Sequence, residues 1–170
     1  MDLALCYHGG DLRLRGYCDA DWASDKDERK STSGYAFTLG GGAISWCSKK
    51  QSCIALSTME AEYVACSAAV QEAVWLRRFL RRLGTSPYGD EAVLIYSDST
   101  SALAYAKDPK YHGKSKHIDI RHHHIRDMVA QEEVVLRHIS TGSMVADPLT
   151  KPIARDVFVS HIKSMGLRRI

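Results

Sequence analysis

The longest periodic pattern in the chain is a row of apolar residues at three- and four-residue spacing, which is typical of an amphipathic helix. The row runs from Ala61 to Leu83. Ser57 stands just before it and is a residue type that caps helix N-termini, whereas Gly84 follows it and is the residue type that most often ends helices. The pattern therefore predicts one long helix between these two residues.

Other apolar runs have the length and alternation of strands. The alternation that begins at Leu12 predicts a strand to about Cys18, and the runs Gly34–Leu39 and Ala43–Ser48, separated by three glycines, predict a hairpin. The run Ala92–Ser97 is almost entirely apolar, as expected of a strand buried in the middle of a sheet. Three strands therefore precede the long helix and one follows it.

The remaining segments predict three shorter helices and one more strand. The helices are Ser99–Lys107, Ile118–Gln131 and Ala154–Met165, and Val134–Ile139 is the final strand. This order predicts an α/β fold. We expect a mixed five-stranded sheet, with three antiparallel strands and then parallel additions, flanked by helices.

Composition places the chain among soluble single domains. It has 170 residues, of which 45% are hydrophobic and 25% charged, and its net charge of +3 leaves a polyanionic partner open. No apolar run reaches the roughly 18–20 residues of a membrane helix, so neither membrane insertion nor secretion is expected. The five cysteines are odd in number and lack C-x-x-C spacing, which predicts reduced thiols.

Four acidic residues stand at positions typical of a site and not on an obviously solvated face: Asp19, Glu62, Asp98 and Asp147. Asp98 ends the most apolar strand, Asp19 ends the first strand, and Glu62 falls on the buried face of the long helix. For Asp98, an alternative role is to cap the helix that follows it. Crowded carboxylates favour a neutralising cation, and oxygen ligands without cysteine select Mg²⁺ or Mn²⁺. Two such ions about 3.5–4 Å apart can promote in-line phosphoryl displacement.

Eight ordered motifs resemble the ribonuclease H domain of copia-type LTR retrotransposon polyproteins. These motifs are Gly16–Ala23, Ser31–Tyr35, Ile44–Trp46, Lys49–Gln51, Ser57–Tyr63, Ser97–Ser99, Lys116–His123 and Ala146–Pro152. The resemblance implies the ribonuclease H fold and hydrolysis of the RNA strand in RNA–DNA hybrids during reverse transcription. It also implies two bound Mg²⁺ ions, for which Mn²⁺ can substitute.

The resemblance also implies which carboxylates are catalytic and hold the metal ions. They are Asp19, Glu62, Asp98 and Asp147. Glu62 is preferred to Glu60 because Glu62 matches the family's Glu-x-x-Ala pattern, and Asp19 is preferred to its neighbour Asp21. Cellular ribonucleases H carry a mobile histidine before the last aspartate, but Ser140–Ser143 fills that loop here.

Polar and basic side chains near these motifs are candidates for binding the nucleic acid. The segment from Lys107 to Arg126 has six basic and two acidic residues, which suits phosphate contacts, although a solvated loop is the alternative. RNA-strand selection requires recognition of the 2′-hydroxyl by polar groups. The candidate nucleic-acid-binding residues are Ser24, Ser57, Thr58, Ser99, Thr100, Lys110, Lys114 and Lys116.

The expected context is a polyprotein whose reverse transcriptase domain is the partner of this domain. Residues 1–11 are then a linker extension, residues 12–152 the ribonuclease H domain and residues 153–170 a C-terminal helix and tail. The domain is expected to be a monomer in isolation and to work in the cytoplasm, within virus-like particles.

Several alternatives stay open at this point. One is a domesticated, inactive domain that binds hybrids or another protein, and a second is a DNA-cutting nuclease of the same fold. A zinc site in the histidine run His122–His124 is disfavoured, because no two of its histidines lie four residues apart on the predicted helix. Trp22, Trp46 and Trp75 are expected to be core aromatics.

Overall fold

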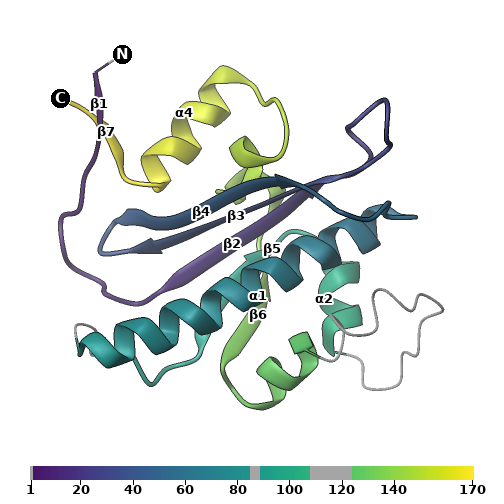
Figure 1. Ribbon diagram of the computed structural model, residues 1–170. Coiled ribbons are helices and arrows are strands. Elements are labelled where there is room, and N and C mark those ends of the chain that lie inside the picture. Colours follow the sequence, from purple (N-terminus) through teal and green to yellow (C-terminus); the bar gives the residue numbers. More distant parts are fainter. Residues whose placement is uncertain (1, 85–88, 108–123) are drawn as a thin grey trace.

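A mixed five-stranded sheet forms the centre of the computed structural model, which describes residues 2–84, 89–107 and 124–170 (Figure 1). The strand order is β4-β3-β2-β5-β6. The strands are β2 (Arg15–Asp21), β3 (Thr32–Leu39), β4 (Gly42–Lys50), β5 (Val93–Ser97) and β6 (Val134–His138). The first three pair antiparallel, and β5 and β6 are added in parallel, which confirms the predicted fold class.

Strand β2 lies further along the chain than its apolar alternation predicted. It begins at Arg15 and continues to Asp21, so Asp19 lies inside the strand, two residues before its end. Arg15 already pairs with Thr38, and β3 ends one residue later at Leu39. The alternating residues before Arg15 therefore have almost no neighbouring backbone left to pair with.

Helix α1 (Thr58–Leu83) has the ends that its flanking residues predicted. The Ser57 side chain accepts a hydrogen bond from the Glu60 amide at 3.2 Å, and Gly84 adopts a left-handed conformation with φ of 64°. Small buried residues from Ala61 to Ala73 recur along one side of the helix. They let α1 lie close against the sheet, which it crosses in Figure 1.

The two faces of the sheet are covered by different segments. Phe37 and Ile95 belong to the large core that α1 covers. Ala36, the neighbour of Phe37 in β3, faces the other way and packs with Val145 and Met165 from the C-terminal part of the chain. Because neighbouring strand residues alternate between faces, β3 supplies both cores.

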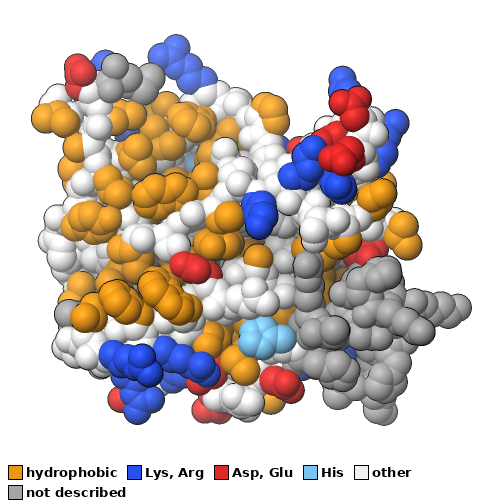
Figure 2. All heavy atoms as spheres, in the orientation of Figure 1, with side chains coloured by type: hydrophobic (Ala, Val, Ile, Leu, Met, Phe, Trp, Pro, Cys, Tyr) orange, Lys and Arg blue, Asp and Glu red, His pale blue; other side chains and the backbone are white. Residues whose placement is uncertain are grey.

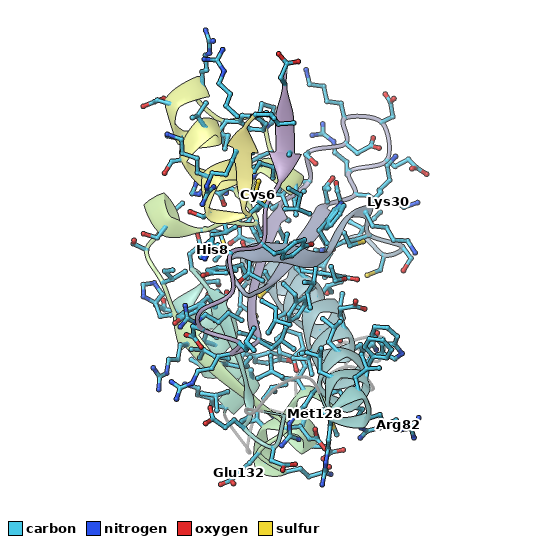
Figure 3. The ribbon with its side chains drawn as sticks, turned by 90° about the vertical axis from the view of Figure 1, so that its left-hand side faces the viewer. Cys6, His8, Lys30, Arg82, Met128 and Glu132 are labelled. Atoms are coloured by element: carbon cyan, nitrogen blue, oxygen red, sulfur yellow. The ribbon has the colours of Figure 1, made fainter. Side chains whose placement is uncertain are left out.

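Shorter elements connect and flank the strands. Helix α2 (Thr100–Lys107) follows β5, and residues 124–130 are helical; the rest of the helix predicted over 118–131 lies outside the described residues. Met128 of this helical stretch is labelled in Figure 3 and is buried in the core beside α1. Two single turns, η1 (Thr141–Ser143) and η2 (Asp147–Leu149), lead from β6 to α4 (Arg155–Ser164).

The chain ends pair with each other, which the sequence did not predict. Strand β1 (Leu3–Leu5) runs antiparallel to β7 (Leu167–Arg169), so the expectation that residues 134–139 form the last strand is wrong (Figure 1). The Cys6 and His8 segment, labelled in Figure 3, continues this contact, because the Cys6 amide donates to the Gly166 carbonyl at 2.9 Å. Three-residue strands carry too short an apolar pattern to be recognised without their partners.

The expectation that the tryptophans are core residues is also wrong. Trp22, Trp46 and Trp75 are 46%, 58% and 58% exposed. Trp46 lies on the outer strand of the sheet, and Trp75 stacks on Phe79 on the outer side of α1 with a centroid distance of 5.2 Å. Figure 2 shows exposed hydrophobic side chains spread mainly over the left half of this face of the molecule.

All five cysteines are free thiols, as predicted. Within the described parts of the chain, no helix combines the length and apolar character that a membrane crossing demands.

Candidate active site

Three aspartates from separate elements meet at one edge of the sheet. Asp19 lies in β2, Asp98 directly follows β5, and Asp147 begins η2. One carboxylate oxygen from each lies within 4.8 Å of the others. The parallel register pairs Tyr17 with Tyr96, which places Asp19 and Asp98 at the same level two residues further on.

Asp19 is 1% exposed, and the turn that follows Asp147 supplies its partners. The Thr150 hydroxyl donates a hydrogen bond to Asp19 Oδ2. Gly34 is the register partner of Asp19, and a Cβ atom there would lie 2.6 Å from Thr150 Cγ2 and 3.0 Å from Leu149 Cβ. The missing side chain at Gly34 therefore lets this turn lie on the strand and reach Asp19.

Lys151 is the cation of this group. Its Nζ lies 3.1 Å from Asp147 Oδ1 and 3.4 Å from Asp19 Oδ2, and its side chain is 29% exposed. Lys151 follows Asp147 by four residues, within the same tight turn. One ammonium group is thus shared between two carboxylates.

Asp98 does not cap helix α2, so the alternative role that the sequence left open for it is excluded. The Ser99 hydroxyl accepts the hydrogen bond from the Ala102 amide at 3.2 Å and so caps α2. The Asp98 carboxylate instead accepts a hydrogen bond from Thr141 Oγ1 of η1 at 2.8 Å. Asp98 is only partly buried and is directed to the shared acidic group.

Glu62 lies near the three aspartates but outside the 4.8 Å group. It belongs to α1, which covers one face of the sheet, whereas Asp147 comes from the segment on the opposite face. Burial, together with the negative charges of Asp19 and Asp98, raises the pKa of Glu62 to about 9. Its Oε2 atom is buried and has no hydrogen-bond partner among the described residues.

Glu60 has a different role from Glu62. Its Oε2 accepts a hydrogen bond from the Leu56 amide at 2.7 Å, while the Ser57 side chain accepts one from the Glu60 amide. This reciprocal pair resembles a capping box and stabilises the first turn of α1. The structure therefore favours Glu62 over Glu60 as the carboxylate available to the acidic group.

The aspartates also disturb one another electrostatically. Burial raises the pKa of Asp147 to about 6, with a further contribution from the charge of Asp19, and the nearby Lys151 opposes this rise. Ionised carboxylates this close together repel each other in a partly desolvated place. This repulsion lowers the stability of the folded, metal-free protein.

A divalent metal ion fits this donor set. Every candidate ligand atom is a carboxylate oxygen, which is the ligand type that Mg²⁺ and Mn²⁺ prefer. The unpartnered Glu62 Oε2 and the mutual repulsion of the aspartates are both explained by a cation that would bind among them. The aspartates, with Glu62 beside them, are the residues that could hold it.

The chain is similar in sequence to Pol polyproteins of plant retrotransposons. It is 49% identical over 91% of its length to the retrovirus-related Pol polyprotein from transposon TNT 1-94 of Nicotiana tabacum. It is 39% identical over 95% of its length to the corresponding polyprotein from transposon RE1 of Arabidopsis thaliana. This chain is a homologue of copia-type retrotransposon Pol polyproteins. It spans about a tenth of these Pol relatives, 11% of each.

The solved structures identify the fold of this Pol homologue. LC11-RNase H1 in complex with an RNA/DNA hybrid superposes with a TM-score of 0.56 and 18% identity, covering 81% of this chain and 94% of that one. The chain therefore has the ribonuclease H fold. No family model matches it.

The predicted nucleic-acid-binding residues fall into two groups. Ser57 and Ser99 cap α1 and α2, and Thr58 and Thr100 are exposed first residues of the same helices. Both helix starts are next to acidic residues of the site. Ser24 lies in the loop after β2, 3.4 Å from the Thr32 hydroxyl. The other group, Lys110, Lys114 and Lys116, lies outside the described residues.

Sequence reasoning missed the residues that orient the carboxylates. Thr141, Thr150 and Lys151 contact the aspartates directly, and Gly34 makes room for the turn that carries two of them. Gly34, Thr150 and Lys151 lie within two of the family motifs, but nothing in those motifs assigned them a role in orienting the carboxylates. Most of the contacts join residues far apart in the sequence, such as Thr150 and Asp19.

Proposed function

We propose that this Pol homologue is a metal-dependent ribonuclease H that hydrolyses the RNA strand of RNA–DNA hybrids. The observation that carries the proposal is the convergence of three aspartate oxygens within 4.8 Å on a ribonuclease H fold. The solved relative of the same fold was captured with an RNA/DNA hybrid, which supports this choice of substrate. Reverse transcription in a retroelement produces such hybrids.

Asp19, Asp98, Asp147 and Glu62 are the proposed catalytic carboxylates, and they would hold two Mg²⁺ ions or Mn²⁺ in their place. The bound ions supply activation of the attacking water and stabilisation of the leaving oxygen. Thr150 and Thr141 orient the carboxylates of Asp19 and Asp98 through their hydroxyl hydrogens. Glu62, neutral in the metal-free protein, must lose its proton before it can serve as an ionic ligand.

Selection of the RNA strand is assigned to polar groups at the two helix starts beside the site. Ser57, Thr58, Ser99 and Thr100 are close in sequence to Glu62 and Asp98, where a 2′-hydroxyl next to the reacting phosphate would be read. Ser24, in the loop after β2, is a further proposed contact to the nucleic acid. Lys110, Lys114 and Lys116 are proposed to contact phosphates by charge.

The biological setting is inferred from the Pol relatives. We propose that the domain acts in the cytoplasm within virus-like particles, beside the reverse transcriptase domain of the same polyprotein, and is a monomer when isolated. Residues 12–152 then form the ribonuclease H domain proper, with residues 1–11 as linker and 153–170 as C-terminal helix and tail.

Cleavage of a hybrid tests the function. A labelled RNA strand in an RNA–DNA hybrid is incubated with the protein in Mg²⁺, Mn²⁺ or EDTA, beside Asp98→Asn. This substitution keeps an oxygen acceptor for Thr141 but removes the charge, so we expect folding to persist and cleavage to be lost. Metal-dependent cutting of the hybrid, with duplex DNA uncut, supports the proposal. Hybrid binding by folded protein without cutting would instead indicate an inactive binding domain, and cutting of DNA a different nuclease.

A further inference from the structure

Lys151 is placed among the carboxylates more firmly than a surface lysine. Its Nζ lies 3.1 Å from Asp147 Oδ1, and 3.5 and 3.4 Å from the two oxygens of Asp19. Among the described residues it is the basic side chain that pairs with these aspartates. Both carboxylates are almost fully buried, so the ammonium reaches into the site from its partly exposed position.

The backbone around Lys151 fixes this position. The Lys151 amide donates to the Asp147 carbonyl at 3.1 Å, which closes the turn. The preceding residue, Thr150, is 9% exposed and is bonded to Asp19. Close approach of the turn to Gly34 leaves it little freedom to move away. The ammonium is therefore delivered to the same oxygen atoms that a divalent ion would use.

We propose that Lys151 is a resident cation of the acidic site, which stabilises the metal-free protein and competes with a divalent ion for Asp19 and Asp147. The inference rests on the proposed function, because it takes the aspartates as metal ligands. A lysine ammonium carries one positive charge and three N–H donors, and it can satisfy two carboxylates without the strict geometry of Mg²⁺.

The competition affects how tightly the site binds metal. A metal ion that binds Asp19 and Asp147 must displace the ammonium or bind against its positive charge, so Lys151 lowers the affinity of the site for metal. Asp98 is hydrogen-bonded to the neutral Thr141, and no ion pair within 4.0 Å joins it to a described basic residue. Lys151 therefore sets how much free metal the enzyme needs before all its carboxylates are engaged.

Binding of Mn²⁺ measures this competition without reference to cleavage. Mn²⁺ is titrated into the wild-type protein and into the Lys151→Met and Lys151→Arg variants. The concentration of free Mn²⁺ is measured by electron paramagnetic resonance. Lys163→Met is the matched control, because Lys163 is an exposed lysine of α4. We expect Lys151→Met to bind Mn²⁺ at least about tenfold more tightly than the wild type. Lys151→Arg keeps the charge and should stay within about threefold, as should Lys163→Met.

Thermal unfolding of the same proteins separates competition from a merely structural role. In EDTA, Lys151→Met should melt several degrees below the wild type, because its carboxylates have lost their counter-charge. In saturating Mn²⁺ this difference should vanish or reverse. A deficit of equal size in both conditions would show lost packing and would overturn the proposal.

The binding outcomes distinguish this inference from the proposed function. If wild-type and Lys151→Met proteins bind Mn²⁺ with equal affinity, and Asp98→Asn abolishes binding, Lys151 is no competitor although the metal site stands. If no folded variant binds Mn²⁺ at these carboxylates, both the competition and the metal-dependent function fall. Tighter binding by Lys151→Met, reversed by Lys151→Arg, supports both.

Discussion

The two ends of β5 carry charged side chains in opposite arrangements. At the amino end, Arg77 forms an ion pair with Glu133, and both side chains are more than four-fifths buried. The same guanidinium donates to the Asp90 carbonyl at 2.6 Å and to the Glu91 carbonyl at 2.9 Å. Every charge named here has a partner of opposite sign or a carbonyl acceptor.

The carboxyl end gathers charges of one sign. Asp98 meets Asp19 and Asp147, Glu62 stands beside them, and Lys151 is the lone cation described among them. Burial and mutual repulsion raise the pKa values of Glu62 and Asp147. The carboxyl end thus has the unbalanced charge expected of a ligand site, whereas the charges named at the amino end are paired, so substitutions at the two ends should have different effects.

The largest expected effect is on activity, from Glu62→Gln. Glutamine has the shape of the protonated acid but cannot become an ionic ligand, so cleavage of the hybrid should fall at least about 100-fold. Stability in EDTA at pH 7 should be unchanged or higher, measured by thermal unfolding. Glu72→Gln is the control, because Glu72 lies on the same helix but bonds to Ser45 away from the site. An active Glu62→Gln enzyme would remove Glu62 from the catalytic set.

A smaller loss of activity is expected from Gly34→Ala. The new methyl group would lie 2.6 Å from Thr150 Cγ2 and push the η2 turn away from Asp19. We expect roughly a 10-fold to 100-fold loss of cleavage, since misplacement by about 1 Å has effects of that order. Gly142→Ala is the matched control, because nothing lies within 4 Å of its Cβ position. Equal activity in both variants would show that the turn does not orient Asp19.

At the amino end, Arg77→Ala should change stability and spare the chemistry. It removes the hydrogen-bond donor of two carbonyls and of Glu133, which keeps only the longer ion pair with Arg78 at 3.8 Å. This loss should lower the free energy of unfolding by about 2 kcal/mol in urea denaturation. The exposed Arg82, labelled in Figure 3, gives the control Arg82→Ala, with a change expected within about 0.5 kcal/mol. The activity of folded Arg77→Ala should match that of the wild type; a specific loss of cleavage would contradict the contrast between the two ends.

The smallest expected effect is on how the stability of the metal-free protein changes with pH. The folded-state pKa values of Glu62, about 9, and Asp147, about 6, are raised above their ordinary values, so the folded state holds protons that the unfolded state has released. The contribution of these two carboxyl groups to the stability of the metal-free protein should therefore fall as pH rises from about 4 to about 9, while the lowered pKa of the buried His161 opposes the fall below neutral pH. Thermal unfolding in EDTA should show this fall, and Glu62→Gln should flatten its upper part. A rise in stability over this range would contradict the pKa shifts.

The sequence predicted best those parts of the fold whose signals are local. Ser57 and Gly84 mark the ends of α1 because caps act on their own helix termini. Strand β2 was misplaced by three residues at its start, since its limit is set by where β3 ends. The β1–β7 pair was missed for the same reason, because each three-residue strand exists only with its partner.

In the candidate site too, the residues with a local signal were predicted and those that depend on tertiary contacts were not. Motifs selected Asp19, Asp98 and Asp147, and the structure brings these three together. Thr150 and Gly34 were not singled out, because their role depends on contact between the η2 turn and β3. These two segments are more than a hundred residues apart in the sequence. Orienting contacts of this kind follow from tertiary packing, which no short pattern encodes.

The most direct test of the central claim is to locate Mn²⁺ in the protein. Crystals grown with Mn²⁺ and measured near the manganese absorption edge should show anomalous density bounded by the carboxylates of Asp19, Asp98 and Asp147, with Glu62 turned to it. The same crystals of Asp98→Asn should lose or weaken that density. Well-ordered crystals in saturating Mn²⁺ without density among these carboxylates would contradict the account.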